Sequence, residues 1–201
     1  MAPTPPDARQ PDPAPPPDRR TLRQRLLQAR KAWSETPEAS AAQLALQERV
    51  WQVLSQLEPD CLGIFWPVQG EFNPREAALK AQQQWRCRLA LPFARRSPVG
   101  MDFRLWTGEP PSRQDECGIP TADGAPVVPD VVLVPCVGFT HSGWRLGYGG
   151  GYFDRYLAAH PQVTAIGVGW ELGRLDENVL SPQAHDQPLV AVITESHTWG
   201  E

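Results

Sequence analysis

The chain lacks the features of a membrane or secreted protein. No apolar run in its 201 residues approaches the roughly 18 residues that a membrane-spanning helix needs. The N-terminus has no basic segment followed by an apolar one, which is the order typical of a secretory signal. We therefore expect a cytoplasmic protein that makes no contact with a membrane.

The sequence also lacks local metal-binding and redox motifs. No CxxC motif is present, and a chain of this size does not need a disulfide framework. The four histidines form no HExxH pair and no other local ligand spacing. We interpret the cysteines as small buried apolar residues. They are Cys61, Cys87, Cys117 and Cys136.

Neither sign of charge is in large excess. The formal net charge is −4, so the composition gives no reason to expect a nucleic-acid partner. Basic residues gather only between Arg19 and Lys31, a pattern that is usually a solvated helix face. Hydrophobic residues make up 41% of the chain, which is ordinary for a globular protein and enough for one domain with a core.

Proline sets the start of the chain apart from the rest. Residues 1–18 contain eight prolines and almost no large apolar side chains. Such a segment cannot bury enough apolar surface to offset the entropy lost on ordering. We predict that residues 1–18 form a disordered tail and that residues 19–201 form a single α/β catalytic domain.

Helices and strands are predicted to alternate along this domain. Apolar periodicity and capping residues indicate helices over 19–35, 38–57, 74–85 and 152–159. Apolar runs indicate strands over 61–68, 86–93, 101–106, 131–139, 163–170 and 190–195. Residues 107–129 hold five prolines and three glycines and are expected to form a long loop. The alternation predicts a mainly parallel sheet with helices on both faces, a Rossmann-like three-layer sandwich.

Periodicity also predicts which side chains of the first two helices face inward. For the first helix these are Leu22, Leu26, Ala29 and Trp33. For the second helix they are Leu46, Val50, Val53, Leu54 and Leu57.

The most informative stretch joins the strand at 131–139 to the helix at 152–159. Four glycines precede the helix, at positions 147, 149, 150 and 151. Glycines at such a junction let backbone N–H groups converge into an anion-binding nest. The helix dipole and the nearby Arg145 favour a phosphate there. The turn also follows the carboxyl end of a strand, where open α/β sheets bind ligands.

This loop matches neither of the common nucleotide-binding motifs. No Lys-Ser or Lys-Thr follows the glycines, as GxxxxGK[ST] requires, and Tyr152 occupies the third glycine position of GxGxxG. The residues alone therefore predict a phosphate-like anion and nothing more specific. The alternative is a turn that only packs a strand against a helix, but three successive glycines are costly for that purpose.

Two aspartates are candidates for binding a hard cation. Asp154 lies in the first turn of the helix after the glycines, and Asp186 precedes the strand at 190–195. Magnesium takes oxygen ligands, commonly one or two carboxylates together with nucleotide phosphates. Taken alone, Asp154 is more often a helix-start residue and Asp186 a turn residue, so a shared role depends on the fold bringing them together.

The segment VPCVGFTHSGWRLGYGGGYFDRYL (134–157) resembles the signature of the 5-formyltetrahydrofolate cyclo-ligase family. That signature is a strand ending in a proline-containing segment, a G-x-RLG-x-G-x-G-aromatic-aromatic-Asp loop and a helix. Further similar segments occur in the family's order, so the resemblance covers about residues 19–195. They are the arginine-rich opening helix, IFWPVQGEFNP (64–74), LPF (91–93) with Met101, and HDQPLVAVITE (185–195).

The resemblance implies an enzyme that uses ATP and magnesium (Mg2+) to cyclise 5-formyltetrahydrofolate to 5,10-methenyltetrahydrofolate, releasing ADP and phosphate. Its partners would be these small-molecule substrates, with no nucleic acid and no membrane, and we expect a monomer. Transfer of the γ-phosphoryl group to the formyl oxygen would make an imidate phosphate, which N10 then attacks. Such chemistry needs positioning and charge neutralisation rather than a protein nucleophile.

The resemblance also implies roles for individual residues. The catalytic residues would be Arg145, Tyr152 and Asp154. Magnesium would be held by Asp154 and Asp186. The folate would be bound by Glu71, accepting hydrogen bonds from the pterin, and by the apolar walls of Trp66, Phe93 and Met101. ATP would be bound by Arg19, Arg20, Thr21, Leu22, Arg23, Arg145, Leu146, Gly147, Tyr148, Gly149, Gly150, Gly151, Tyr152 and Phe153.

Several positions depart from the family pattern. Thr140 stands where many members have Asp, Phe153 replaces the commoner second Tyr, and Arg19 replaces a usual Lys. Thr121-Ala122 replaces a frequent Glu-Pro. Thr140 and the lost Glu-Pro weakly favour a degenerate paralogue that binds nucleotide or folate without turnover. An enzyme of another class on a related α/β scaffold, such as a sugar-phosphate isomerase, also stays open.

Overall fold

The computed structural model describes residues 18–200, so the predicted tail lies outside the described residues except for Asp18. The helices are α1 (Arg19–Ser34), α2 (Glu38–Leu57), α3 (Arg75–Trp85), α4 (Tyr152–Ala159) and the short 3-10 helix η1 (Glu171–Gly173). The first six strands are β1 (Cys61–Gly63), β2 (Arg88–Arg96), β3 (Val99–Trp106), β4 (Arg113–Gln114), β5 (Pro120–Thr121) and β6 (Pro126–Val127). The others are β7 (Val131–Pro135), β8 (Gly138–Phe139), β9 (Arg145–Leu146), β10 (Thr164–Val168), β11 (Ala191–Ile193) and β12 (Thr198–Gly200).

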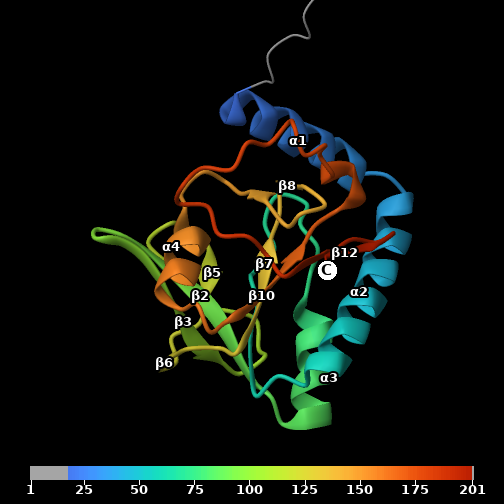
Figure 1. Ribbon diagram of the computed structural model, residues 1–201. Coiled ribbons are helices and arrows are strands. Elements are labelled where there is room, and N and C mark those ends of the chain that lie inside the picture. Colours follow the sequence, from blue (N-terminus) through green and yellow to red (C-terminus); the bar gives the residue numbers. More distant parts are fainter. Residues whose placement is uncertain (1–17, 201) are drawn as a thin grey trace, which may run out of the picture.

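One eight-stranded sheet forms the centre of the described chain (Figure 1), in the order β12-β11-β10-β7-β1-β2-β3-β6. The five neighbouring strands from β11 to β2 run parallel to one another. At the edges, β12 is antiparallel to β11, and β3 is antiparallel to both β2 and β6. The prediction of an α/β fold with a mainly parallel sheet is therefore confirmed.

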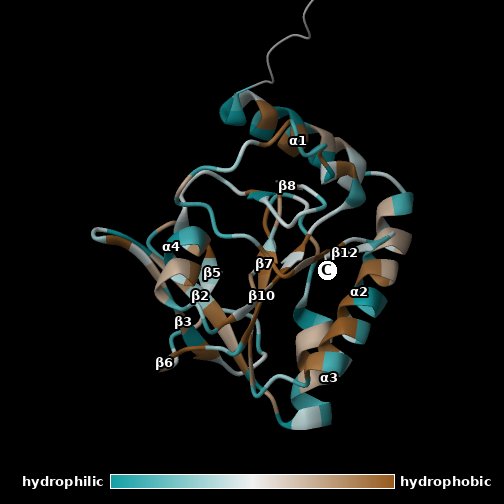
Figure 2. Ribbon diagram, viewed as in Figure 1, coloured by the Kyte–Doolittle hydropathy of each residue, from teal (hydrophilic) through white to brown (hydrophobic). Residues whose placement is uncertain are grey.

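Helices cover both faces of this sheet, as predicted. Figure 1 shows α2 and α3 on one side and α4 on the other, with α1 across one end. Successive residues of β7 point to opposite faces of the sheet. Leu133 packs in a buried cluster with residues of α2 and α3, whereas Val134 packs in a cluster with residues of α4. Because side chains alternate along a strand, a strand buried on both faces must be apolar throughout. Figure 2 shows β7 and β10 as largely hydrophobic.

The β2–β3 hairpin was not predicted. Only Ser97 and Pro98 connect the two strands, and Arg96 pairs with Val99. A two-residue connection can join only antiparallel strands, since a parallel pair needs a crossover of a dozen or more residues. The predicted strand ended at Phe93, whereas β2 continues to Arg96. The predicted connection to the next strand was therefore too long to indicate a hairpin.

Some other boundaries also differ from the predictions. The strand predicted over 61–68 ends at Gly63, after which Pro67 lacks an N–H group and Gln69 and Gly70 adopt positive φ. The predicted loop 107–129 contains the short strands β4, β5 and β6. A further strand, β12, follows the one predicted to be last.

Two inward-facing predictions for the helices are wrong. Leu57 is 39% exposed at the end of α2. In α1, Ala29 is exposed while the neighbouring Arg30 is buried. This helix lies across loops rather than along the sheet, so its buried side includes a charged residue that hydropathy alone assigns to solvent. No helix among residues 18–200 is long and apolar enough to cross a bilayer.

We predict that Leu133→Ala lowers the free energy of unfolding by about 2–5 kcal/mol, because it removes buried methyl groups and leaves a cavity in the central strand. Leu133 is fully buried, whereas Leu44 of α2 is 65% exposed and provides a matched control. Denaturant unfolding followed by circular dichroism should show a large loss for Leu133→Ala and almost none for Leu44→Ala. Equal losses would contradict the assignment of β7 to the centre of the core.

Candidate functional site

A cavity of about 500 Å³ lies at the carboxyl ends of the central strands. Its lining includes Pro135, which ends β7, and Phe65, which follows β1. The other walls come from α1, from the β2–β3 hairpin and from the segments 66–71, 115–119, 145–154 and 183–186. The fold therefore brings together segments that are far apart in the sequence, and the glycine turn lies at the edge of the sheet where it was expected.

The glycine loop joins β9 to α4. Gly149 and Gly151 have φ values of +93° and +62°, in the left-handed region that favours glycine. The Arg23 Nε atom donates to the carbonyl oxygen of Gly147 at 2.6 Å, and Arg155 donates to that of Gly150. Within residues 18–200, the N–H groups of residues 148–151 donate no hydrogen bond. These backbone donors are therefore available for an anion.

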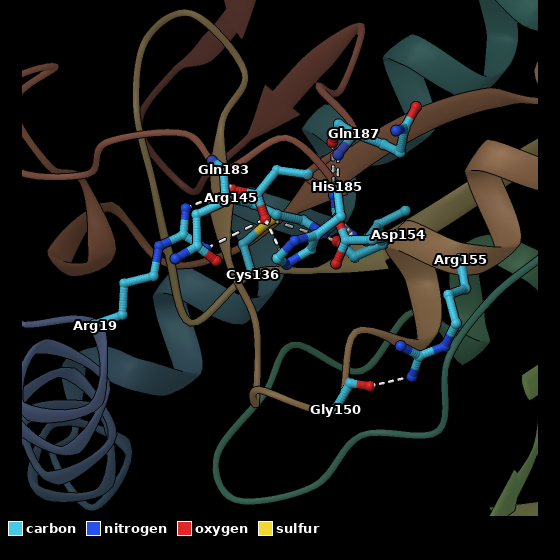
Figure 3. A network of polar contacts seen from close by, with 11 residues as sticks. Arg19, Cys136, Arg145, Gly150, Asp154, Arg155, Gln183, His185 and Gln187 are labelled. Carbon is cyan, nitrogen blue, oxygen red and sulfur yellow. Dashed lines mark hydrogen bonds and ion pairs between the residues drawn. The ribbon is translucent and has the colours of Figure 1, made fainter. Parts of the chain in front are cut away.

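An ion pair joins the two ends of this loop (Figure 3). Arg145, whose side chain is only 4% exposed, donates to the Asp154 Oδ1 atom at 2.8 Å. Arg145 also donates to the carbonyl oxygen of Gln187 at 2.8 Å. The Gln187 N–H in turn donates to Asp154 Oδ1 at 3.2 Å. The start of α4 is thus tied directly to the segment that carries Asp186.

A second ion pair connects α1 with this segment. Arg19 pairs with the Asp186 carboxylate and donates to the carbonyl oxygen of Ser181 at 2.9 Å. Burial by itself would raise the pKa of Asp186, but hydrogen bonds from Arg19 and from the Gln183 N–H hold this pKa below its ordinary value. Asp186 is therefore ionised at neutral pH.

The two aspartates line the same cavity, but neither is a free carboxylate. Each already pairs with an arginine. Among the residues described here, no group of three or more His, Cys, Asp or Glu side chains could hold a metal ion by itself. Magnesium commonly takes one or two carboxylates and completes its coordination with phosphates and water. The residues therefore fit a cation that arrives with phosphate, not a metal held by protein alone.

Glu71 lies beside the glycine loop. Its Oε2 atom accepts a hydrogen bond from the Val68 N–H at 2.8 Å, and its Oε1 atom accepts one from the Tyr148 hydroxyl at 2.7 Å. Burial raises the pKa of Glu71, while these two donors and the charge of Arg30 oppose the rise. The carboxylate is thus anchored at the wall of the cavity by the loop to which Tyr148 belongs.

Of the predicted apolar walls, Trp66 and Met101 line the cavity and Phe93 does not. Ala94 pairs with Met101 across the hairpin, and both face the cavity. Phe93 is one residue out of phase and lies on the opposite face, where the guanidinium carbon of Arg104 sits 4.0 Å from the ring centroid. Phe93 therefore does not line this cavity, unlike the other two predicted wall residues.

Some of the predicted ATP-binding residues of α1 line the cavity and others do not. Arg19 and Arg23 line the cavity, whereas Arg20, Thr21 and Leu22 do not. Leu22 packs in a small buried cluster with Leu146 and Leu180. The Thr21 hydroxyl donates to Asp18, whose carboxylate also accepts from the first backbone N–H groups of α1. Thr21 and Leu22 therefore hold the helix in place, and the exposed Arg20 side chain does not line the cavity either.

Sequence reasoning missed three residues of the lining in the segment 107–129, namely Asp115, Cys117 and Ile119. Asp115 is buried and accepts hydrogen bonds from the N–H groups of Ala94, Cys117 and Ile119. The Cys117 Sγ atom lies 3.2 Å from the Tyr152 hydroxyl. The length of this segment was the available signal, because a long loop in a compact domain is often functional.

Known proteins resemble this chain over most of its length. A family model described as "5-formyltetrahydrofolate cyclo-ligase family" matches residues 16–195. A protein named 5-formyltetrahydrofolate cyclo-ligase from Mycolicibacterium smegmatis is 32% identical over 185 residues, covering 86% of this chain and 91% of the relative. One of the same name from Escherichia coli K12 is 36% identical over 72 residues, which are 35% of this chain and only 38% of that relative's length.

Solved structures support the same relationship at the level of the fold. A 5,10-methenyltetrahydrofolate synthetase from Mycoplasma pneumoniae matches with a TM-score of 0.73 and 22% identity, covering 89% of this chain and 99% of the other. One from Aquifex aeolicus matches with a TM-score of 0.66 and 23% identity, covering 90% and 92%. The family match over residues 16–195 and the relative from Mycolicibacterium smegmatis show that the chain belongs to the 5-formyltetrahydrofolate cyclo-ligase family.

Proposed function

We propose that this protein catalyses the ATP-dependent cyclisation of 5-formyltetrahydrofolate to 5,10-methenyltetrahydrofolate, with ADP and phosphate as the other products. Membership of the family supports this activity. The observation that carries it is the composition of one cavity. Free backbone N–H groups and arginines, suited to phosphates, lie there beside an anchored carboxylate and apolar walls, suited to a pterin.

The glycine loop and α1 would bind the phosphates of ATP. The free N–H groups of residues 148–151 and the N-terminus of α4 favour an anion. Arg19 and Arg23 line the same space and would neutralise the charge that builds up on the transferring phosphoryl group. The assignment of Arg145 and Tyr152 as catalytic residues stays a prediction, since Arg145 is engaged by Asp154 and Gln187, and Tyr152 by Cys117.

Asp154 and Asp186 would hold magnesium together with ATP phosphates. When bound there, the cation would supply positive charge to the transferring phosphoryl group. Asp154 also balances the buried Arg145, so its removal would affect the fold as well as the metal. A cytoplasmic location, a monomeric state and a single catalytic domain from residue 19 remain predictions.

The proposed reaction has two steps that the cavity would position. The formyl oxygen forms a bond to the γ-phosphorus while the bond from that phosphorus to ADP breaks. N10 then attacks the formyl carbon and loses its proton, and phosphate leaves with the former formyl oxygen. Neither step needs a protein nucleophile, so the residues act by holding the two substrates together and excluding water.

The decisive experiment measures ADP formation by the purified protein with ATP and magnesium, with and without 5-formyltetrahydrofolate. We expect ADP only when folate is present, accompanied by the near-ultraviolet absorbance of the methenyl product. ADP formation without folate would indicate a generic ATPase. Binding of both ligands without product would indicate the non-enzymatic paralogue.

The glycine loop yields a specific prediction about ATP. Gly149→Ala should weaken ATP binding at least about tenfold, because the residue adopts positive φ and its new Cβ atom would lie 3.2 Å from the Arg23 guanidinium carbon. Gly118→Ala is the matched control, since Gly118 also has positive φ but its Cβ atom would meet nothing within 4 Å. Calorimetric titration should show intact ATP binding only for the control. If both variants bind ATP like the parent, the loop is not the phosphate site.

Glu71 yields the corresponding prediction about folate. Glu71→Gln should weaken 5-formyltetrahydrofolate binding about tenfold to a hundredfold and leave ATP affinity nearly unchanged. The new amide group presents donors where a buried carboxylate accepted them, and an unpaired buried donor costs about 1–3 kcal/mol. Glu76→Gln, at an exposed position of α3, is the control. A loss of ATP affinity with unchanged folate affinity would place Glu71 in the nucleotide site instead.

A further inference from the structure

The hydroxyl group of Tyr148 lies between a buried arginine and Glu71. Arg30 donates a hydrogen bond to this hydroxyl, and the hydroxyl donates to Glu71 Oε1 at 2.7 Å. The three residues come from α1, the glycine loop and the segment that follows β1. A single side chain of the glycine loop therefore connects the proposed nucleotide-binding loop to the proposed folate carboxylate.

Arg30 determines which groups donate and which accept in these two hydrogen bonds. Arg30 is only 3% exposed, and its Nε atom also donates to the carbonyl oxygen of Gln69 at 3.0 Å. An arginine has donors only, so the Tyr148 hydroxyl must accept from it. The hydroxyl proton is then directed to Glu71. Burial and the nearby Glu71 raise the pKa of Tyr148, so it keeps this proton at any physiological pH.

Glu71 gains two things from this donor. First, each carboxylate oxygen has two lone pairs, and each oxygen accepts one protein hydrogen bond, from Tyr148 or from Val68. One acceptor position per oxygen remains for a ligand with two adjacent donors. Second, the Tyr148 hydrogen bond opposes the rise in the pKa of Glu71 that burial causes, so it favours the ionised form that can accept at both oxygens.

We propose that Tyr148 is a positioning residue for folate recognition: held by the hydrogen bond from Arg30, its hydroxyl orients the Glu71 carboxylate. This inference rests on the proposed function, because it takes the pterin as the ligand of Glu71. The nearby Tyr152, at the start of α4, contacts Cys117 instead. Tyr148 and Tyr152 therefore contact different parts of the cavity wall.

The test compares Tyr148→Phe with the parent protein. Direct titration of 5-formyltetrahydrofolate should show an affinity about tenfold weaker for the variant, because a hydrogen bond to a charged group is lost. ATP affinity measured alone should fall much less than folate affinity, because the variant keeps the backbone N–H group of residue 148. Tyr156→Phe is the matched control, since the buried Tyr156 hydroxyl has no hydrogen-bond partner among the described residues. This control should bind folate like the parent.

The pH dependence separates positioning from a general loosening of the loop. Removing the Tyr148 donor raises the pKa of Glu71 further, so the ionised carboxylate is lost at a higher pH as the pH falls. Folate affinity of Tyr148→Phe should therefore begin to weaken at a higher pH than that of the parent. An equal affinity loss at every pH would point to a purely structural role and overturn the proposal.

A double variant tests whether Tyr148 acts through Glu71. If Tyr148 acts through Glu71, then Tyr148→Phe should cause little further loss in a Glu71→Gln background. Fully additive losses, or a parent that binds no folate, would overturn the inference. A parent that binds folate but forms no folate-dependent ADP would contradict the proposed catalytic function alone, because the binding measurements would still test Tyr148.

Discussion

The buried ion pair of Arg145 and Asp154 is the constraint on which the site depends. An arginine with a side chain 4% exposed needs a partner, because an unpaired charge in the interior is strongly destabilising. Here the partner lies nine residues along the chain, on the far side of the glycines. The pair therefore closes the loop at its base, and the glycines between are held in a compact arc rather than left to vary.

Arginines also attach α1 to the rest of the molecule. Arg19 reaches Asp186, Arg23 reaches the carbonyl of Gly147, and Arg30 reaches that of Gln69. Sequence alone favoured a solvated basic face for this segment, but the structure shows a basic face in contact with loops. Because Arg19 and Arg23 also line the cavity, phosphate binding would have to rearrange or share contacts that hold the helix in place.

The sequence allowed the fold class, the glycine loop and the helix 152–159 to be predicted, because all three depend on local patterns. Phe93 could not be placed, since one residue of strand phase decides which face it occupies. The connection from Arg30 through Tyr148 to Glu71 could not be predicted either. Tyr148 is 118 residues from Arg30 and 77 from Glu71, and no local periodicity encodes a contact at such separations.

The contact between Cys117 and the Tyr152 hydroxyl also places a reactive thiol group next to the glycine loop. Three of the four cysteines are buried, and only Cys117 is partly exposed. Thiol reagents attack accessible cysteines in preference to buried ones. A fluorophore or spin label introduced into the unaltered protein would therefore attach at one position, against the wall of the cavity and next to the start of α4. Spectroscopy of nucleotide binding at this site thus requires no engineered cysteine.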